Sequence, residues 1–307
     1  MNIDKKIVNG VEYIIEKYDN TVRASVLSVK CKDKNINIES SIDGIPVTTI
    51  RRSAFAGSKI ETITMPDCIS YIHECAFEGS NIRNIKMPKG LISIGNFAFN
   101  NCRNLESIEF NDGLKHIGAY AFNKCIKLKD IETPENLKFL STSAFSECSS
   151  LVSINLKGTS FEFMPGKDGF ATTCPNLKNI YVNPRHPKYM SVNGVLYNDF
   201  TKELIRVPPA LNLKKLTIPD WVRILERDSF EGVKSISTLI ISRPKLGFLY
   251  GSKISTIQPL QIYCVPGSAV EEWANSCGIN TAPYGSISKM SEFINTLTDE
   301  NKVNDIN

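Results

Sequence analysis

The sequence lacks long apolar runs, basic clusters and an apolar leader. No stretch of about 18 apolar residues occurs, so no helix is expected to span a membrane. The 36 basic and 32 acidic side chains leave a net charge of only +4, without a basic stripe, so we expect no nucleic-acid partner. The opening residues MNIDKKIVNG carry charges with no apolar core behind them. The sequence as given therefore predicts no export signal.

Catalytic and metal-binding motifs are also missing. There is no Gly-x-Ser-x-Gly, no His-Glu-x-x-His and no glycine-rich phosphate loop. The three histidines, His73, His116 and His186, are too widely spaced to suggest a shared zinc site. We therefore predict no enzyme, no metal site and no cofactor. The nine cysteines include no Cys-x-x-Cys pair, and there is no Asn-x-Ser/Thr sequon, which together favour a reducing, cytoplasmic compartment.

One pattern dominates what is present: the dipeptide Ala-Phe recurs five times, at intervals of 22 or 23 residues. Aliphatic residues stand five and eight places before each Phe, and a serine or cysteine stands three places after it. Units this short cannot close a core alone and must bury their apolar side against their neighbours. We expect a solenoid with strands about 4.8 Å apart and the phenylalanines in one internal column. The five dipeptides are Ala54-Phe55, Ala76-Phe77, Ala98-Phe99, Ala121-Phe122 and Ala144-Phe145.

Three cysteines, Cys102, Cys125 and Cys148, occupy the small-residue position after Phe in successive units. Their expected stacking distance would permit disulfides, but side chains that point in parallel disfavour the disulfide torsion. We therefore expect buried free thiols that pack as small hydrophobic groups.

Segments such as LISIGNFAFNNCRNLESIEF and LKHIGAYAFNKCIKLKDIETP resemble the BspA-like class of leucine-rich repeat, over about residues 7 to 280. The glycine of that class is present at Gly95 and Gly118 but replaced by Arg51, His73 and Ser141. The expected fold is a β-rich α/β solenoid, a right-handed leucine-rich-repeat coil with an N-terminal β-hairpin cap and a C-terminal capping helix. Proteins of this class are largely bacterial and protist surface or secreted proteins, so the resemblance implies adhesion and a cell-surface or secreted location as the alternative to the cytoplasm.

The expected organisation has six parts. The runs VEYIIEKY and TVRASVLSV suggest the first hairpin, and two strands around a turn near 198–202 suggest an inserted one. Ser268 and Glu271 are spaced as a capping box at the start of the helix. The parts are 1–45, N-terminal capping hairpin; 46–182, leucine-rich repeats; 183–212, inserted β-hairpin; 213–265, leucine-rich repeats; 266–280, C-terminal capping helix; and 281–307, a polar tail with a possible short helix.

Function is expected on the solvent-facing positions of the stacked strands, where polar groups recur along a rigid surface. The predicted ligand face consists of Thr64, Lys86, Glu109, Glu132, Asn155 and Tyr181, with Asn84 and Asp130 from the row two places earlier. A second row on the other strands carries aromatics that could face a ligand or pack on one another. That row is Thr49, Tyr71, Ser93, His116, Phe139 and Phe163.

Two functions remain open from the sequence. The first is a non-enzymatic protein–protein interaction module of the BspA-like type, with a protein or other macromolecular ligand and adhesion as its implied role. The alternative is an intracellular structural or scaffold protein that assembles through the tail helix. We expect a monomer, with a weak dimer through 281–307 as the alternative.

Overall fold

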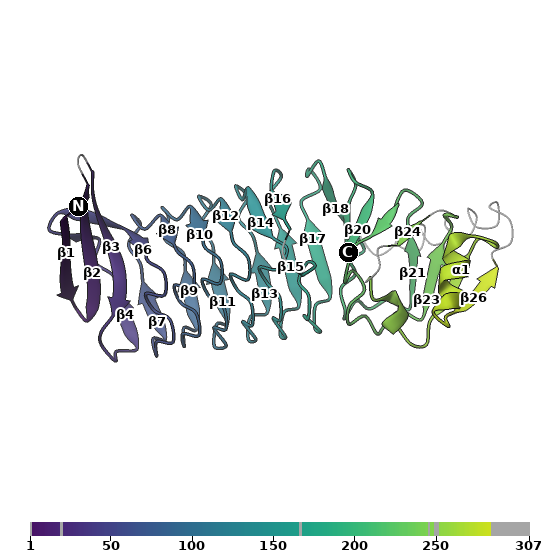
Figure 1. The fold of residues 1–307 in the computed structure, drawn as a ribbon, viewed down its shortest axis with the longest axis horizontal. Coiled ribbons are helices and arrows are strands. Elements are labelled where there is room, and N and C mark those ends of the chain that lie inside the picture. The colour runs from purple at the N-terminus through teal and green to yellow at the C-terminus, as the bar shows by residue number, and fades with distance from the viewer. Residues whose placement is uncertain (1, 19–20, 166–167, 245, 249–251, 284–307) are drawn as a thin grey trace, which may run out of the picture.

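The computed structural model describes residues 2–18, 21–165, 168–244, 246–248 and 252–283. These residues form a solenoid whose turns stack along one long axis, from β1 at one end to α1 and β26 at the other (Figure 1). Most turns contribute one short strand to each of two sides. The fold is thus a β-solenoid, a coil whose successive turns are built of short strands, as the repeat predicted.

The first side carries a ten-stranded sheet. Its first three strands are antiparallel, and the strands from β3 to β16 run parallel. In sheet order these are β1 (Asn2–Val8), β2 (Val11–Tyr18), β3 (Thr21–Val29), β6 (Ile45–Ile50), β8 (Tyr71–Ile72), β10 (Ser93–Ile94), β12 (His116–Ile117), β14 (Phe139–Ser141) and β16 (Glu162–Met164), with β5 (Ser41–Ile42) paired to β6.

The opposite side carries four shorter parallel sheets, each built from successive turns. They are β4 (Asn35–Asn37) with β7 (Thr62–Thr64); β9 (Asn84–Lys86) with β11 (Ser107–Glu109); β13 (Asp130–Glu132), β15 (Ser153–Leu156) and β17 (Asn179–Val182); and β21 (Lys215–Ile218), β23 (Thr238–Ile241), β25 (Gln261–Cys264) and β26 (Asn280–Pro283).

A further five-stranded sheet follows β16 along the solenoid and begins with the inserted segment. It consists of β18 (Tyr189–Val192), β19 (Val195–Asn198), β20 (Glu203–Arg206), β22 (Ile224–Leu225) and β24 (Gly247–Phe248). The described helices are the 3₁₀ turn η1 (Ile254–Thr256) and α1 (Ala269–Ser276). Ser268 caps α1 by accepting a hydrogen bond from the Glu271 amide.

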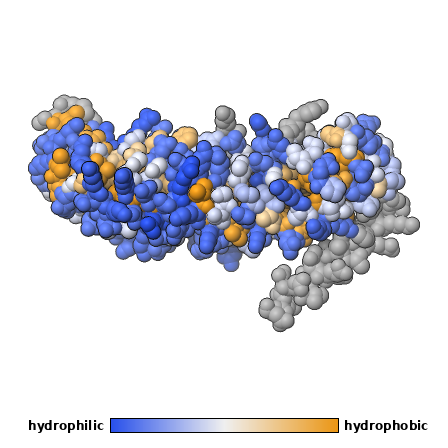
Figure 2. Space-filling view, turned by 90° about the horizontal axis from the view of Figure 1, so that it is seen from below, coloured by the Kyte–Doolittle hydropathy of each residue, from blue (hydrophilic) through white to orange (hydrophobic). Residues whose placement is uncertain are grey.

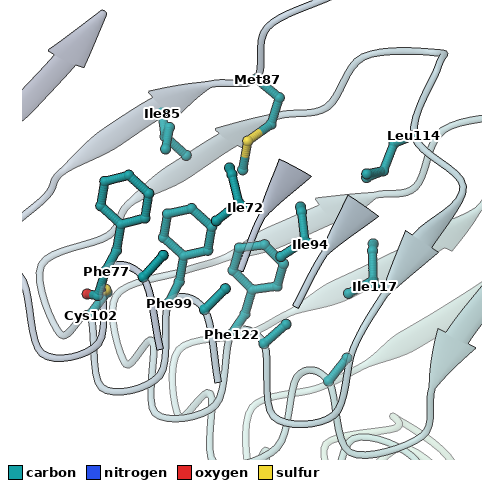
Figure 3. Close-up of a cluster of buried hydrophobic side chains, with 14 of the residues drawn as sticks. Ile72, Phe77, Ile85, Met87, Ile94, Phe99, Cys102, Leu114, Ile117 and Phe122 are labelled. Atoms are coloured by element: carbon teal, nitrogen blue, oxygen red, sulfur yellow. The ribbon is translucent and has the colours of Figure 1, made fainter. Parts of the chain in front are cut away.

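The core is the predicted column of phenylalanines. From Phe55 to Phe145 the five rings are at most 1% exposed. Successive ring centroids lie 5.0, 4.8, 5.2 and 5.5 Å apart, with planes within 10° of parallel. The isoleucines of β8, β10 and β12 form a second buried row beside the rings (Figure 3). Each turn therefore buries its apolar side on its neighbours, as the repeat length requires.

The cysteine column is also present, and all nine cysteines are free thiols. Each buried column thiol donates to the carbonyl oxygen of the phenylalanine one turn earlier: Cys102 to Phe77 at 3.0 Å and Cys148 to Phe122 at 3.1 Å, for example. A small side chain with a weak donor suits this position, because it fills the space and satisfies a buried carbonyl. The prediction of buried free thiols is confirmed.

The apolar core divides into two clusters, one running from Val11 to Leu196 and the other from Val195 to Ile279. Arg206, 1% exposed, lies near the division. Its guanidinium donates to the carbonyl oxygens of Asp228 at 2.5 Å and Ala171 at 3.4 Å and lies 3.6 Å from Glu231. A polar network thus joins the turns on either side of the inserted segment.

Three elements differ from the predicted boundaries. β1 lies before the predicted hairpin and joins β2 through Asn9-Gly10, and β18 lies before the predicted strands of the insertion and joins β19 through Asn193-Gly194. Both turns have positive φ at both residues, the conformation that Asn-Gly favours in two-residue hairpins. β26 crosses the predicted boundary at 280/281, because this short strand, Asn-Thr-Ala-Pro, is ordered by pairing with β25.

Candidate functional site

The predicted ligand face lies on the sheets of the opposite side. Strand register aligns Lys86 with Glu109, and Glu132 with Asn155 and Tyr181. All eight predicted residues point outward: Asn155 is half-buried, Tyr181 is 49% exposed, and the others are exposed. Solvent-facing polar side chains therefore recur from turn to turn on this side of the solenoid.

These side chains also pair with one another. The Lys86 Nζ lies 2.9 Å from Glu109 Oε1, and Lys157 forms an ion pair with Glu132. The hydroxyls of two serines donate across the same strands at 2.6 Å, Ser107 to Asn84 and Ser153 to Asp130. The face is thus a ladder of internally satisfied polar groups. A ligand on it would meet charged and neutral polar groups of fixed order, with Lys86 followed by Glu109 and Glu132.

The second predicted row is correct in part. Tyr71, His116 and Phe139 occupy equivalent register positions, and the His116 and Phe139 rings stack at 5.1 Å. Phe163 does not belong to this row: Glu162 pairs with Phe139, and Phe163 pairs with Leu140. The prediction was wrong because the approach to β16 shifts the register by one residue, and a one-residue shift exchanges the two faces of a strand.

A cavity of about 450 Å³ opens where the first-side sheet ends at β16 and the sheet of β18, β19 and β20 begins. Aromatic and aliphatic side chains line part of it, and carboxylates line another part. The lining residues are Thr142, Phe163, Pro165, Asp168, Gly169, Phe170, Tyr189, Asn198, Glu203, Ile205, Glu226 and Arg227.

The aromatic part of the cavity is tightly packed. The Phe163 ring lies 4.6 Å from that of Tyr189 and 5.0 Å from that of Phe170, centroid to centroid. The Phe163 amide donates to the Tyr189 hydroxyl oxygen at 3.3 Å, which satisfies backbone at the free edge of β16. Burial raises the pKa of Tyr189 above its usual value. This wall is therefore preformed.

The acidic part consists of Asp168, Glu203 and Glu226. Asp168 Oδ2 accepts a 2.6 Å hydrogen bond from the hydroxyl of Tyr120, whose pKa burial raises to about 12. Glu203 Oε2 accepts from the Thr201 hydroxyl at 2.5 Å. Burial, and then the neighbouring charge of Glu203, raise the pKa of Glu226. Glu203 and Glu226 thus line the same partly desolvated space, where their negative charges repel each other.

The sequence held a signal for this cavity that the repeat analysis did not use. The stretch FEFMPGKDGF lengthens the turn before Phe170, and the insertion 183–212 follows it. Together they interrupt the sheet of the first side, so that β16 is not followed by a parallel strand in register. Irregular backbone leaves space that a regular turn would fill.

Other predicted features can be placed. The His186 Nε2 lies 3.0 Å from the Phe161 carbonyl oxygen, and burial lowers the pKa of this histidine. His73 and His116 lie on separate turns of the first side. Within the described ranges, no three His, Cys, Asp or Glu side chains form a group that could hold a metal ion. No helix in the same ranges is long and apolar enough to cross a membrane.

The sequence and the fold both have known counterparts. A family model for the BspA-type leucine-rich repeat region matches residues 48–178 in six copies. Among solved structures, the chain is similar to a leucine-rich cell surface protein from Faecalibacterium prausnitzii, with a TM-score of 0.57 and 19% identity over 94% of this chain and 97% of the other. It is also similar to the pneumococcal vaccine antigen PcpA, with a TM-score of 0.58 and 14% identity over 92% and 99% of the two chains. No curated protein matches the sequence.

Proposed function

Because residues 48–178 belong to the BspA-type leucine-rich repeat family, we propose that this chain is a non-enzymatic protein-interaction module that binds a macromolecule along one face of its solenoid. Repeat solenoids present extended surfaces that suit long partners. The observation that carries the proposal is the ladder of polar side chains on the opposite-side strands, held in strand register from turn to turn.

The ladder can recognise a partner by its pattern of charge. Lys86 is 76% exposed and its partner Glu109 is 65% exposed, so both remain available to a ligand. Exposed ion pairs contribute at most about 1 kcal/mol to folding, which leaves their charges free to be used for recognition. Complementary charges across an interface mainly determine partner choice and association rate. Most of the surface in Figure 2 is hydrophilic, with hydrophobic residues in small separate groups.

Affinity capture of partners by the whole chain tests this proposal. The double substitution Lys86→Glu with Glu109→Lys keeps an ion pair but inverts the charge pattern, so the fold should be retained and partner recovery lost. The matched control exchanges Lys124 and Glu147, which stand two residues after Phe122 and Phe145 and form a solvent-accessible ion pair with an N–O distance of 3.6 Å. Recovery that is unaffected by the first exchange would place binding on another surface.

We further propose adhesion as the biological setting, since one structural neighbour is described as a cell surface protein and another as a vaccine antigen. Labelled protein should then bind intact cells, and the inverted-charge variant should bind them less. The scaffold alternative depends on residues 281–307, of which 281–283 belong to β26 and the remainder lies outside the described residues. It stays a prediction, and a solution mass that is unchanged on deleting 284–307 would remove it.

A further inference from the structure

We propose that the cavity between β16 and β20 binds a basic side chain, arginine or lysine, of a partner protein. This inference rests on the proposed interaction function and adds a second site to it, distinct from the polar ladder. The cavity lies on the first side of the solenoid, whereas the ladder lies on the opposite side. The two sites can therefore be tested separately.

The charge of the cavity is the first argument. Its lining has three carboxylates, Asp168, Glu203 and Glu226, and one cation, Arg227. Arg227 is exposed, and its Nε lies 3.6 Å from Oδ2 of Asp228, a residue that does not line the cavity. Across the described chain, no ion pair joins Glu203 or Glu226 to a basic residue. A cation placed between these two glutamates would relieve both their mutual repulsion and their loss of hydration.

The aromatic part of the lining and the size of the cavity are the second argument. Phe163 and Tyr189 present aromatic surface in the same cavity as the glutamates. A guanidinium or ammonium group is attracted to the face of an aromatic ring, and its alkyl chain packs on apolar surface. A volume of about 450 Å³ lies within the range of ligand pockets, about 300–1,000 Å³. Strand register places Tyr189 and Glu203 on either side of Asn198 in one sheet, so aromatic and carboxylate side chains lie next to each other in the cavity. This combination matches both parts of an arginine or lysine side chain.

The rim of the cavity is the third argument. Asn198, a lining residue, caps the turn between β19 and β20 by accepting from the amides of Phe200 and Thr201 at 3.1 and 3.2 Å. Phe200, on that turn, is 74% exposed, the highest value among the exposed large hydrophobic side chains of the described residues. Exposed aromatics beside a pocket are typical anchors of protein interfaces. The occupant is therefore taken to be part of a protein.

A pair of peptides that differ only in charge tests the inference. The probe is acetyl-Gly-Arg-Gly-amide, and its neutral match carries citrulline in place of arginine. Binding to the whole chain is measured by saturation-transfer NMR and by titration calorimetry. The arginine peptide should bind at least about tenfold more tightly than the citrulline peptide, since a charged group in a hydrogen bond is worth about 1.5–3 kcal/mol. Added salt should weaken the binding.

Matched variants locate the site. Glu203→Gln with Glu226→Gln should remove the preference for arginine over citrulline, whereas Glu272→Gln, at an exposed position of α1 outside both proposed sites, should leave it unchanged. Equal binding of both peptides to the unaltered chain would overturn the inference without use of any variant. A preference that survives the two cavity substitutions would also overturn it. Failure of the ladder exchange to alter partner capture would bear on the proposed function alone, so the two proposals fail separately.

Discussion

Phe99→Ala is the most direct perturbation of the core. The Phe99 ring is fully buried between Phe77 and Phe122, at centroid distances of 4.8 and 5.2 Å. Its removal takes away contacts on both faces, and neighbouring turns are held in register by backbone hydrogen bonds such as that from the Phe99 amide to the Ala121 carbonyl oxygen at 2.7 Å. We expect the turns to collapse only partly into the space.

The size of the effect follows from two contributions. Loss of burial of a phenylalanine side chain costs about 1.5–3 kcal/mol. A remaining cavity on the order of 80 Å³ adds about 2 kcal/mol at ~24 cal/mol per Å³. The sum agrees with the range of about 3–5 kcal/mol found for large aromatic truncations in cores. Phe99→Ala should therefore lower the free energy of unfolding by about 3–5 kcal/mol.

Urea unfolding followed by circular dichroism measures this change, with the midpoint and slope fitted for each variant. The matched control is Phe139→Ala, because Phe139 also stacks on a ring of the neighbouring turn but is 38% exposed. This control should lose less than Phe99→Ala. It loses about 0.5–1.5 kcal/mol of ring pairing and only part of a full burial of about 1.5–3 kcal/mol, and truncation at a partly exposed site leaves no closed cavity. A loss below about 1 kcal/mol for Phe99→Ala, or equal losses for both variants, would refute the idea that the Phe column is the core.

Three further predictions concern other parts of the chain. Alkylation of the native protein, mapped by mass spectrometry, should modify the exposed Cys277 and spare Cys125, because burial raises the pKa of the Cys125 thiol well above its usual value; equal rates would contradict this. Glu226→Gln should raise the urea midpoint at neutral pH. Burial and the charge of Glu203 raise the pKa of Glu226 in the folded protein, so ionisation of this carboxyl opposes folding as the pH rises from the usual glutamate pKa to the raised one. The gain in midpoint should vanish in acid below the usual glutamate pKa, and a gain that persists there would rule out this cause. Arg206→Lys should lower stability by about 1–3 kcal/mol, since an ammonium group cannot reach the separate acceptors of the guanidinium, and no loss in thermal unfolding would show that the network is dispensable.

The regular turns could be predicted from the sequence because they repeat the same local problem. Each unit places Phe, two aliphatics and a small residue in one register, and the only way to bury them is against the next unit. Burial of the residues from Phe55 to Phe145, the parallel pairing and the free cysteines all follow from that constraint. The period itself contained the information.

The extra strands were missed for a different reason. β1 and β18 each end at an Asn-Gly turn, and such turns depend on two residues only. An Asp43-Gly44 turn joins β5 to β6 in the same way. Asn-Gly and Asp-Gly between strand-forming residues predict two-residue hairpins, so this signal was present in the sequence. Repeat counting does not detect it, because it occurs where the repeat is absent.

The candidate sites divide along the same line. The ladder could be predicted because alternate residues of a strand face solvent, a property of the strand alone. The lining of the cavity could not, because it depends on how β16, residues 168–170 and the β19–β20 hairpin approach one another in space. The register change that moves Phe163 inward also creates its aromatic wall. A single-residue shift of this kind is invisible to spacing averaged over five units.

The contrast between regular and irregular turns bears on where specificity arises in this solenoid. On the regular turns, charged groups such as Lys86 and Glu109 pair with each other along the axis, so a new substitution in one unit can be balanced by its neighbour. Where the first-side sheet is interrupted after β16, the charges of Glu203 and Glu226 repel one another, and no basic side chain of the described residues forms an ion pair with either of them. Buried or half-buried like charges oppose folding unless something compensates them. An external cation, as proposed for the cavity, would supply that compensation, so the interruption of the repeat is the part of the chain whose chemistry a partner would complete.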